Sequence, residues 1–229
     1  MNLTLQPRHP DRPQPFRVRH PVTGWLTLAV VSVAVVVIVV SSAAAADGEV
    51  AEWEAETLRF FNDWPNWLEP PMWVLQQVGV IMAPVIGGLV IVWYTRNWLH
   101  LVPFVLVLPL KLGIEKSIIK QLVERERPYV SIGPEINVRG SAFEGLSYPS
   151  GHATTAFALG ILVAGFLPPR WRPLPLCWAV VVAVARLYYG EHNILDVVAG
   201  AATGTAFAMV LWFTFLNRFA RPDGPETRR

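Results

Sequence analysis

The chain has 229 residues, of which 53% are hydrophobic and only 16% are charged, and its formal net charge at neutral pH is +2. With a mean hydropathy of +0.38, this composition excludes an ordinary soluble domain and predicts a protein embedded in a bilayer. The basic residues do not cluster on one predicted face, which argues against a nucleic-acid-binding protein. The single cysteine, Cys177, excludes an intrachain disulfide and is expected to pack as a small hydrophobic side chain.

The first part of the chain predicts a basic tail followed by a membrane-spanning helix. Residues 1–23 carry four arginines among five prolines, and so many prolines exclude a helix interior. Residues 24–46 contain no charge, and about 23 residues at 1.5 Å per residue are enough to cross ~30 Å of hydrocarbon. A secretory signal has a shorter apolar core, so we expect a retained first span. The small residues at positions 41–46 leave cleavage as an alternative.

The next segment, residues 47–69, is acidic and rich in aromatic side chains. It holds seven acidic residues against a single base, Arg59. Its aromatic residues recur at roughly helical spacing, and they are Trp53, Phe60, Phe61, Trp64 and Trp67. This pattern predicts a helix that lies along the membrane surface between the first and second spans. A loop that caps the helix bundle is the alternative.

Residues 70–95, and the stretch that begins at Trp98, predict the second and third spans. In the second span, Pro84 and the Gly87-Gly88 pair are expected to produce a kink. The third is apolar only as far as Leu110, and charged residues follow it at helical spacing, namely Lys111, Glu115, Lys116 and Lys120. Charges at that depth are costly, so we expect them to face the bundle interior or a wet cavity. An ion pair between Lys111 and Glu115 is the alternative.

Three further apolar stretches complete an all-α membrane protein, a predicted bundle of six transmembrane helices. The fourth span covers residues 151–167, the fifth begins at residue 173 and ends near residue 185 unless it continues to 189, and the sixth covers residues 193–216. Gly200 and Gly204 give the sixth helix a small face for close packing. This packing could lie within the bundle or between subunits, so the oligomeric state is left open.

The distribution of lysine and arginine predicts how this bundle is oriented. Basic residues gather in two tails, residues 1–23 and 218–229, whereas the acidic segment after the first span holds only one. By the positive-inside rule both termini lie in the cytoplasm, and residues 24–217 form a six-span domain between the tails. The loop after the third span breaks the rule, because it places three arginines on the outer side, Arg125, Arg127 and Arg139.

Three short motifs fall on the outer side of this predicted membrane protein. The first is Lys120, six further residues and Arg127-Pro128, the second is Tyr148-Pro149-Ser150-Gly151-His152, and the third is Arg186, five further residues, His192, three further residues and Asp196. If a helix begins at Asn193, His192 and Asp196 lie on one face, with the carboxylate placed to hold an imidazole nitrogen. A cation, a base and a carboxylate then converge.

In this order and on one side of the membrane, the motifs resemble the signature of the type 2 phosphatidic acid phosphatase family, membrane lipid phosphatases whose fold is shared with vanadium haloperoxidases. One position departs from the family pattern, because Ala185 stands where a serine is usual, which puts one secondary hydrogen bond in doubt. The resemblance implies that His192 attacks phosphorus to form a phosphohistidine and that Asp196 orients His192. It also implies that His152 protonates the leaving oxygen.

The same motifs suit a phosphate group on physical grounds. Lys120, Arg127 and Arg186 supply positive charge, and the planar fork of arginine matches phosphate oxygens. Ser150 can donate its hydroxyl, and Gly151 can present its backbone N–H where the fourth helix begins. Because these cations stand where a divalent ion would, no metal or cofactor is expected. We predict activity that survives chelators and has a bell-shaped pH profile.

Other polar residues are expected to lie outside the catalytic set. Solvated loop charges are expected at Glu124, Arg125, Glu126 and Glu144, and His100 is expected to be an interfacial residue near the cytoplasmic side. Arg139 could touch a substrate head group, and we assign it no role.

We therefore expect an integral protein of the cytoplasmic membrane that removes a terminal phosphate from an anionic lipid at the outer leaflet. Undecaprenyl pyrophosphate, the lipid carrier of wall synthesis, is the expected substrate of what looks like a bacterial chain. Phosphatidylglycerophosphate, phosphatidate and a polyprenyl-linked sugar phosphate are alternatives, because the motifs bind phosphate and do not identify the lipid. Phosphoryl transfer to another lipid, and a transporter or scaffold that has kept these residues, are the other classes.

Overall fold

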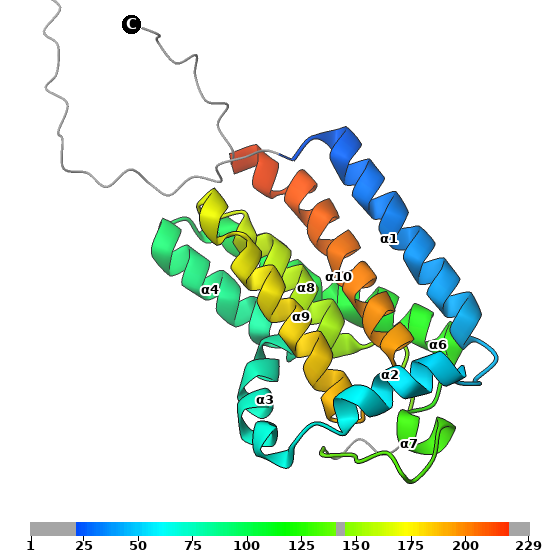
Figure 1. Cartoon of the computed structure of the whole chain (residues 1–229). Coiled ribbons are helices and arrows are strands. Elements are labelled where there is room, and N and C mark those ends of the chain that lie inside the picture. The colour runs from blue at the N-terminus through cyan, green and yellow to red at the C-terminus, as the bar shows by residue number, and fades with distance from the viewer. Residues whose placement is uncertain (1–21, 141–144, 220–229) are drawn as a thin grey trace, which may run out of the picture.

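The computed structural model describes residues 22–140 and 145–219, and within these ranges every regular element is a helix (Figure 1). The main helices are α1 (Gly24–Ala45), α2 (Glu52–Asn62), α3 (Glu69–Gln76), α4 (Ala83–Thr95), α5 (Leu101–Leu110), α6 (Lys120–Val123), α7 (Pro128–Ser131), α8 (Gly151–Ala164), α9 (Pro173–Tyr188) and α10 (Ile194–Thr214). The all-helical class is therefore confirmed. Most of the two predicted basic tails, residues 1–21 and 220–229, lies outside the described residues.

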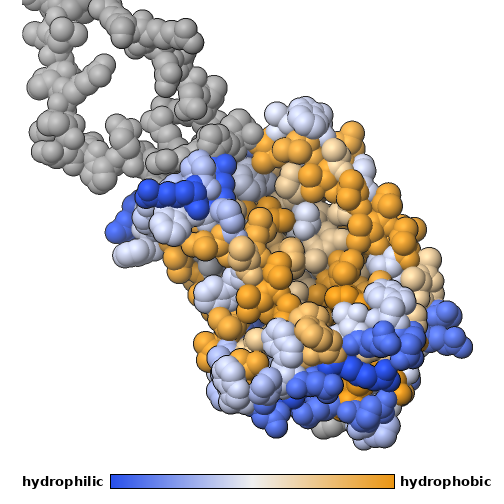
Figure 2. All heavy atoms as spheres, in the orientation of Figure 1, coloured by the Kyte–Doolittle hydropathy of each residue, from blue (hydrophilic) through white to orange (hydrophobic). Residues whose placement is uncertain are grey.

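The protein is a membrane protein by the length and composition of its helices. Two helical segments, Gly24–Ala45 and Ile194–Arg218, are long and apolar enough to cross a bilayer. The pair Asn66–Gly79 and Ala83–Thr95, bent by 72° at its break, could provide a third crossing. Figure 2 shows hydrophobic residues over the middle of the visible face, with hydrophilic residues gathered toward its two ends. These findings establish two or three candidate spans among the described residues.

The bend in the second predicted span lies earlier than expected. It falls at the break between Gly79 and Ala83, so Pro84 stands in the first turn of α4, where a proline costs no backbone hydrogen bond. Gly87 and Gly88 lie within α4, and a Cβ added at either would come within 2.7 Å of a leucine side chain of a neighbouring helix. These two glycines therefore allow close helix packing, and the expectation that they kink the chain was wrong.

The third predicted span is one helical run in which a π-helix, Lys111–Ile119, connects α5 to α6. The ion pair named as the alternative is present, with 3.8 Å between Lys111 Nζ and Glu115 Oε2. Lys111 Nζ also donates to the backbone oxygen of Gly151 at 2.6 Å and to Thr155 Oγ1 at 3.0 Å. The lysine thus faces the first turn of α8, as expected for a charge directed into the bundle, whereas Lys116 is exposed.

The acidic segment after α1 contains a helix, as predicted. The buried face of α2 includes Glu54, Leu58 and Asn62, and its exposed aromatic residues are Trp53 and Phe60. Asn62 Nδ2 donates to the backbone oxygens of Asn137 and Tyr188, at 2.9 and 3.0 Å. These contacts fasten α2 across one end of the bundle.

The two central helices, α8 and α10, pack with almost no space between their backbones. A Cβ added to Gly200 would collide with the backbone oxygen of Ser150, and one added to Gly204 would collide with that of Thr154. The small face predicted for the last helix therefore serves packing within the bundle. The same contact brings the start of α8 beside the start of α10, where the second and third motifs lie.

The two ends of the described chain meet at the opposite end of the bundle. The backbone N–H of Val22 donates to Asn217 Oδ1 at 2.8 Å, and Asn217 Nδ2 donates to the backbone oxygen of Val22 at 2.6 Å. Figure 1 shows α2, α3 and α7 gathered at the other end, beyond the start of α10. The motifs and the chain ends are thus separated by the length of the bundle.

Two side chains lie where the sequence did not place them. Cys177 is exposed on α9 and does not pack inside the bundle. His100 is buried, with Nδ1 2.8 Å from Thr95 Oγ1 and its ring against Phe166. His100 thus packs inside the protein, where a hydroxyl partner satisfies its ring nitrogen.

Candidate active site

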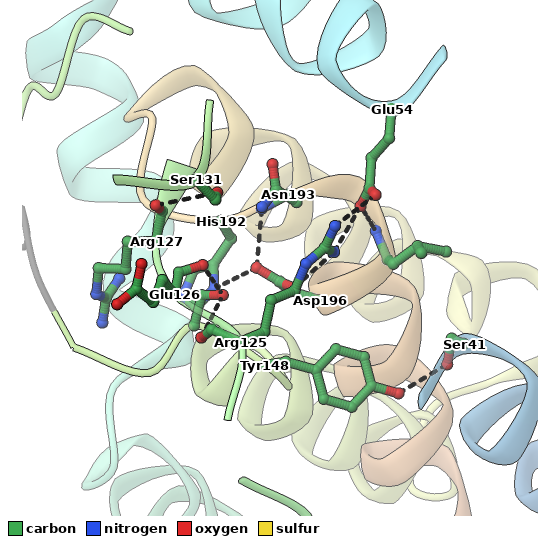
Figure 3. A network of polar contacts seen from close by, with 12 residues as sticks. Ser41, Glu54, Arg125, Glu126, Arg127, Ser131, Tyr148, His192, Asn193 and Asp196 are labelled. Atoms are coloured by element: carbon green, nitrogen blue, oxygen red, sulfur yellow. Dashed lines mark hydrogen bonds and ion pairs between the residues drawn. The ribbon is translucent and has the colours of Figure 1, made fainter. Parts of the chain in front are cut away.

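The three motifs meet at the end of the bundle that α2 covers. Lys120 is the first residue of α6, Arg127 immediately precedes α7, and Ser150 immediately precedes α8. The backbone N–H of Ser150 donates to the backbone oxygen of Asp196 at 2.8 Å, which joins the second motif directly to the third. The hydroxyl of Tyr148 lies 2.8 Å from Ser41 Oγ and so ties the second motif to α1 as well (Figure 3).

A tight turn between α9 and α10 presents the third motif. Gly190 has a φ of +67°, a left-handed conformation that favours glycine. A Cβ at this position would lie 2.8 Å from the backbone oxygen of Asn137. The glycine thus permits both the turn and the close approach. Arg186 lies in the last turn of α9, before the turn, and His192 follows after it.

His192 and Asp196 form a buried pair, with relative exposures of 3% and 0%. His192 lies in the turn before α10, not within the helix, yet its Nδ1 is 3.4 Å from Asp196 Oδ2. The same carboxylate oxygen accepts a hydrogen bond from the backbone N–H of Asn193 at 2.9 Å, which fixes its position. Nδ1 makes no hydrogen bond within the described residues, and a proton held there on the side of Asp196 would leave the Nε2 lone pair available for attack.

Burial lowers the pKa of His192 well below its ordinary value, and the positive charges of Arg186, Arg127 and Lys120 lower it further. An imidazole with a lowered pKa is uncharged at neutral pH. The environment therefore favours the nucleophilic form of His192 under physiological conditions.

This pKa shift predicts the acidic limb of the pH profile. Because the imidazole stays neutral until the pH falls through its lowered pKa, we expect kcat/KM to remain high at pH 6.5, near the ordinary pKa of histidine, and to fall only under more acidic conditions. Phosphate release by detergent-solubilised protein, measured between about pH 4 and pH 9, tests this expectation. An acidic limb centred at or above pH 6.5 would contradict it.

Two arginines of the motifs converge on one carboxylate. Arg186 is buried, and its guanidinium contacts Gln76 Oε1 and the carboxylate of Glu191. Arg127 Nη1 donates to the backbone oxygen of Glu191 at 2.9 Å and lies 3.7 Å from Glu191 Oε2. The arrangement is therefore already an anion-binding site, with a side chain of the protein as its anion. The sequence offered one signal for Glu191, a charge directly before His192.

The remaining motif residues surround the same region. The charges that act on His152 include those of Arg186, His192, Lys111 and Arg127. Lys120 likewise interacts electrostatically with Arg127 and Asp196. Within the described residues, several buried side-chain atoms have no hydrogen-bond partner, and two of them that belong to phosphate-binding candidates are Ser150 Oγ and Arg186 Nε. Buried donors normally have partners, so these two atoms mark places where a ligand can bind.

A polar cavity of about 490 Å³ opens beside these residues, bordered by His152 and Arg186 and further lined by Gln76, Gln77, Arg139, Tyr189 and Glu191 among others. Its volume lies within the ordinary range for small-molecule sites. Arg139 is held firmly at its edge, because Nη1 donates to the backbone oxygen of Tyr188 at 2.6 Å and the guanidinium lies 4.1 Å from the centre of the Tyr188 ring. Its contacts fix the loop that bears it.

The position of Arg125 differs from the prediction. It was expected to be a solvated loop charge, but it is fully buried between Glu54 and Asp196 (Figure 3). Its loop folds beneath α2, and only the three-dimensional structure brings Glu54 there. Glu124 and Glu126 are exposed as predicted, and Glu144 lies outside the described residues.

Ala185, which departs from the expected motif, is fully buried beside Met72, Tyr188 and Tyr189. The alanine methyl therefore fills an apolar position on α9 next to Arg186.

A model of the PAP2 superfamily matches residues 98–220, a range that contains all three motifs. The chain belongs to this superfamily. Among PAP2 relatives, the bacitracin transport permease protein BcrC of Bacillus licheniformis is 27% identical over 170 residues, covering 72% of this chain and 81% of BcrC. The undecaprenyl-diphosphatase of Sulfolobus acidocaldarius is 31% identical over 121 residues, covering 52% of this chain and 53% of that enzyme. This chain therefore spans about half the length of that relative.

The fold agrees with that of a solved PAP2 protein. The crystal structure of a transmembrane PAP2-type phosphatidylglycerolphosphate phosphatase from Bacillus subtilis matches with a TM-score of 0.63 and 20% identity, covering 79% of this chain and 93% of that one. The family resemblance inferred from the three motifs is thus confirmed, and the fold is that of a PAP2 protein.

Proposed function

We propose that this PAP2 protein is a membrane lipid phosphatase that removes a terminal phosphate through a phosphohistidine on His192. The observation that carries the proposal is the buried His192–Asp196 pair directly after Glu191, on whose carboxylate Arg127 and Arg186 converge. Arg186 and Glu191 also line the polar cavity. A nucleophile, its orienting carboxylate and an anion-binding pair of guanidiniums are the groups that phosphoryl transfer needs.

In the proposed reaction, Arg127, Arg186 and Lys120 bind the phosphate oxygens, together with the hydroxyl of Ser150 and the backbone N–H of Gly151. Nε2 of His192 forms a bond to phosphorus while the bond to the leaving oxygen breaks, and His152 gives its proton to that oxygen. Asp196 stabilises the positive charge that develops on the imidazole. Water then cleaves the phosphorus–nitrogen bond and inorganic phosphate leaves. The three cations stabilise the transition state without a metal ion.

The membrane arrangement is part of the proposal. In this proposal the six crossings are α1, the bent α3–α4 pair, the α5–α6 run, α8, α9 and α10. An even number of crossings puts both chain ends on one side, and the mutual hydrogen bonds of Val22 and Asn217 support this arrangement. The arginines of the two tails place that side in the cytoplasm, so the site faces outward from the cytoplasmic membrane.

The polar lining of the cavity favours a substrate in which the part of the leaving group nearest to phosphorus is polar. His152 borders the cavity, and its neighbours there include Gln76, Gln77 and Arg139. If His152 protonates the leaving oxygen, the leaving group lies in this polar space. The space suits the phosphate that stays on the lipid of undecaprenyl pyrophosphate, or the glycerol phosphate of phosphatidylglycerophosphate. Phosphatidate, whose leaving group is diacylglycerol, suits it less well. We propose undecaprenyl pyrophosphate as the substrate, and its presence in the name of the Sulfolobus relative supports this choice.

A substrate panel tests the proposal. Detergent-purified protein is given undecaprenyl pyrophosphate, phosphatidylglycerophosphate and phosphatidate, and inorganic phosphate is measured with and without EDTA. We expect stoichiometric phosphate release, the highest kcat/KM for undecaprenyl pyrophosphate, and no effect of EDTA. Loss of activity in EDTA would overturn the metal-free mechanism. Transfer of labelled phosphate to a lipid alcohol without release would favour a phosphotransferase, and a folded protein inactive on all three lipids would favour a transporter such as the name of BcrC describes.

A further inference from the structure

A chain of three buried charges runs behind the proposed nucleophile. Its members, Glu54, Arg125 and Asp196, have relative exposures of 1%, 0% and 0% and come from α2, the loop between α6 and α7, and the first turn of α10. Arg125 lies at the centre. Its Nη1 donates to Glu54 Oε1 at 2.8 Å and its Nη2 donates to Glu54 Oε2 at 2.7 Å, so the two side chains form a bidentate ion pair (Figure 3).

The contact between Arg125 and Asp196 is of a different kind. A single nitrogen, Nη1, donates to Asp196 Oδ1 at 3.4 Å, which is long for a charged hydrogen bond. The other carboxylate oxygen of Asp196, Oδ2, faces His192 Nδ1 and accepts from the backbone N–H of Asn193. The two oxygens are thus divided, one toward the guanidinium and one toward the imidazole.

Glu54 also reaches the start of α10. Its Oε1 accepts a hydrogen bond from the backbone N–H of Leu195 at 3.0 Å. Leu195 directly precedes Asp196, the other carboxylate that contacts Arg125. Glu54 therefore holds the guanidinium by its short contacts and fixes it relative to the first turn of α10. The strong pairing of Arg125 is with Glu54, which leaves Asp196 as an acceptor for His192.

We propose that Arg125, anchored by Glu54, is a positioning residue for the proposed phosphatase reaction and acts on it only through Asp196. Two carboxylates buried this close favour uptake of a proton by one of them unless a cation separates them. Arg125 supplies that cation and favours the ionised form of Asp196, whose Oδ2 faces His192. Within the chain, α2 thereby becomes part of the catalytic support although it carries none of the three motifs.

A double-mutant cycle tests this inference. The variants are Arg125→Met, Asp196→Asn and both together, and the readouts are kcat and KM for phosphate release from undecaprenyl pyrophosphate. Arg125→Met alone is expected to lower kcat by on the order of 10- to 100-fold, the usual cost of removing a group that orients a reactive side chain, with KM changed less than about twofold. In the Asp196→Asn background the same change is expected to alter kcat by less than about twofold, because the residue through which Arg125 acts is already disabled.

A second variant separates positioning from folding. Arg125→Met leaves the Glu54 carboxylate buried and unpaired, which destabilises the protein, whereas Glu54→Gln/Arg125→Met removes both charges. We expect this double variant to recover the thermal unfolding midpoint of the wild type and to keep the low kcat. Recovery of wild-type kcat would overturn the proposal, as would an equal loss from Arg125→Met in both Asp196 backgrounds. A wild-type protein that releases no phosphate would instead refute the proposed function, and this inference with it.

Discussion

Replacing His192 with alanine is expected to abolish phosphate release, with a loss of at least about 10⁴-fold in kcat. The imidazole is the only side chain in the proposed mechanism that bonds to phosphorus, and it is buried beside Asp196. The measurement is phosphate release in detergent, together with an acid-labile phosphoprotein trapped from labelled substrate in the wild type and missing in the variant.

Two controls make this result specific. The thermal unfolding midpoint of His192→Ala should stay within a few degrees of the wild type, because Asp196 keeps its contacts to Arg125 and to the Asn193 backbone. Replacement of Lys116, which is exposed, should leave turnover unchanged. A His192→Ala variant with full activity would show that another group attacks phosphorus or that the protein is a transporter.

Replacing Gly204 with alanine is expected to have the largest effect on stability. Its added Cβ would collide with the backbone oxygen of Thr154 and lie 3.0 Å from the backbone nitrogen of Ala158. Backbone atoms of a helix cannot move aside without shifting α8 away from α10, so we expect a loss of about 3 kcal/mol and a large decrease in phosphate release. The thermal unfolding midpoint measures this loss.

Gly113 provides the matched control. It also lies in a helical run, but a Cβ added there has no atom within 4 Å. Gly113→Ala should therefore keep or slightly raise the unfolding midpoint, because alanine restricts the unfolded chain. Equal destabilisation by the two substitutions would mean that contact between α8 and α10 does not limit stability.

The sequence predicted the long apolar helices well, because their boundaries depend on local composition. The first predicted span, residues 24–46, and the last, residues 193–216, differ from α1 and α10 by at most two residues at each end. The fifth helix continues to Tyr188, the longer of the two predicted alternatives. In each case the change from apolar residues to charge, proline or glycine ends the helix.

What the sequence did not predict depends on contacts between distant segments. Glu54 and Arg125 are 71 residues apart, and both looked like ordinary surface charges until α2 folded over the loop that carries Arg125. The sequence likewise did not predict the position of the bend before α4 or the π-helix that begins at Lys111. Glu191 was passed over because it fills one of the five unassigned positions between Arg186 and His192, and only the fold shows that its carboxylate meets two motif arginines.

The position of Glu191 has a consequence for turnover. In the proposed reaction an arriving phosphate replaces this carboxylate, so substrate binding exchanges one anion for another and does not simply fill a vacant site. When inorganic phosphate departs, the carboxylate of Glu191 can return to Arg127 and Arg186. The two buried guanidiniums then do not remain without a counter-ion. A built-in competitor of this kind weakens retention of the product and allows the next lipid to enter.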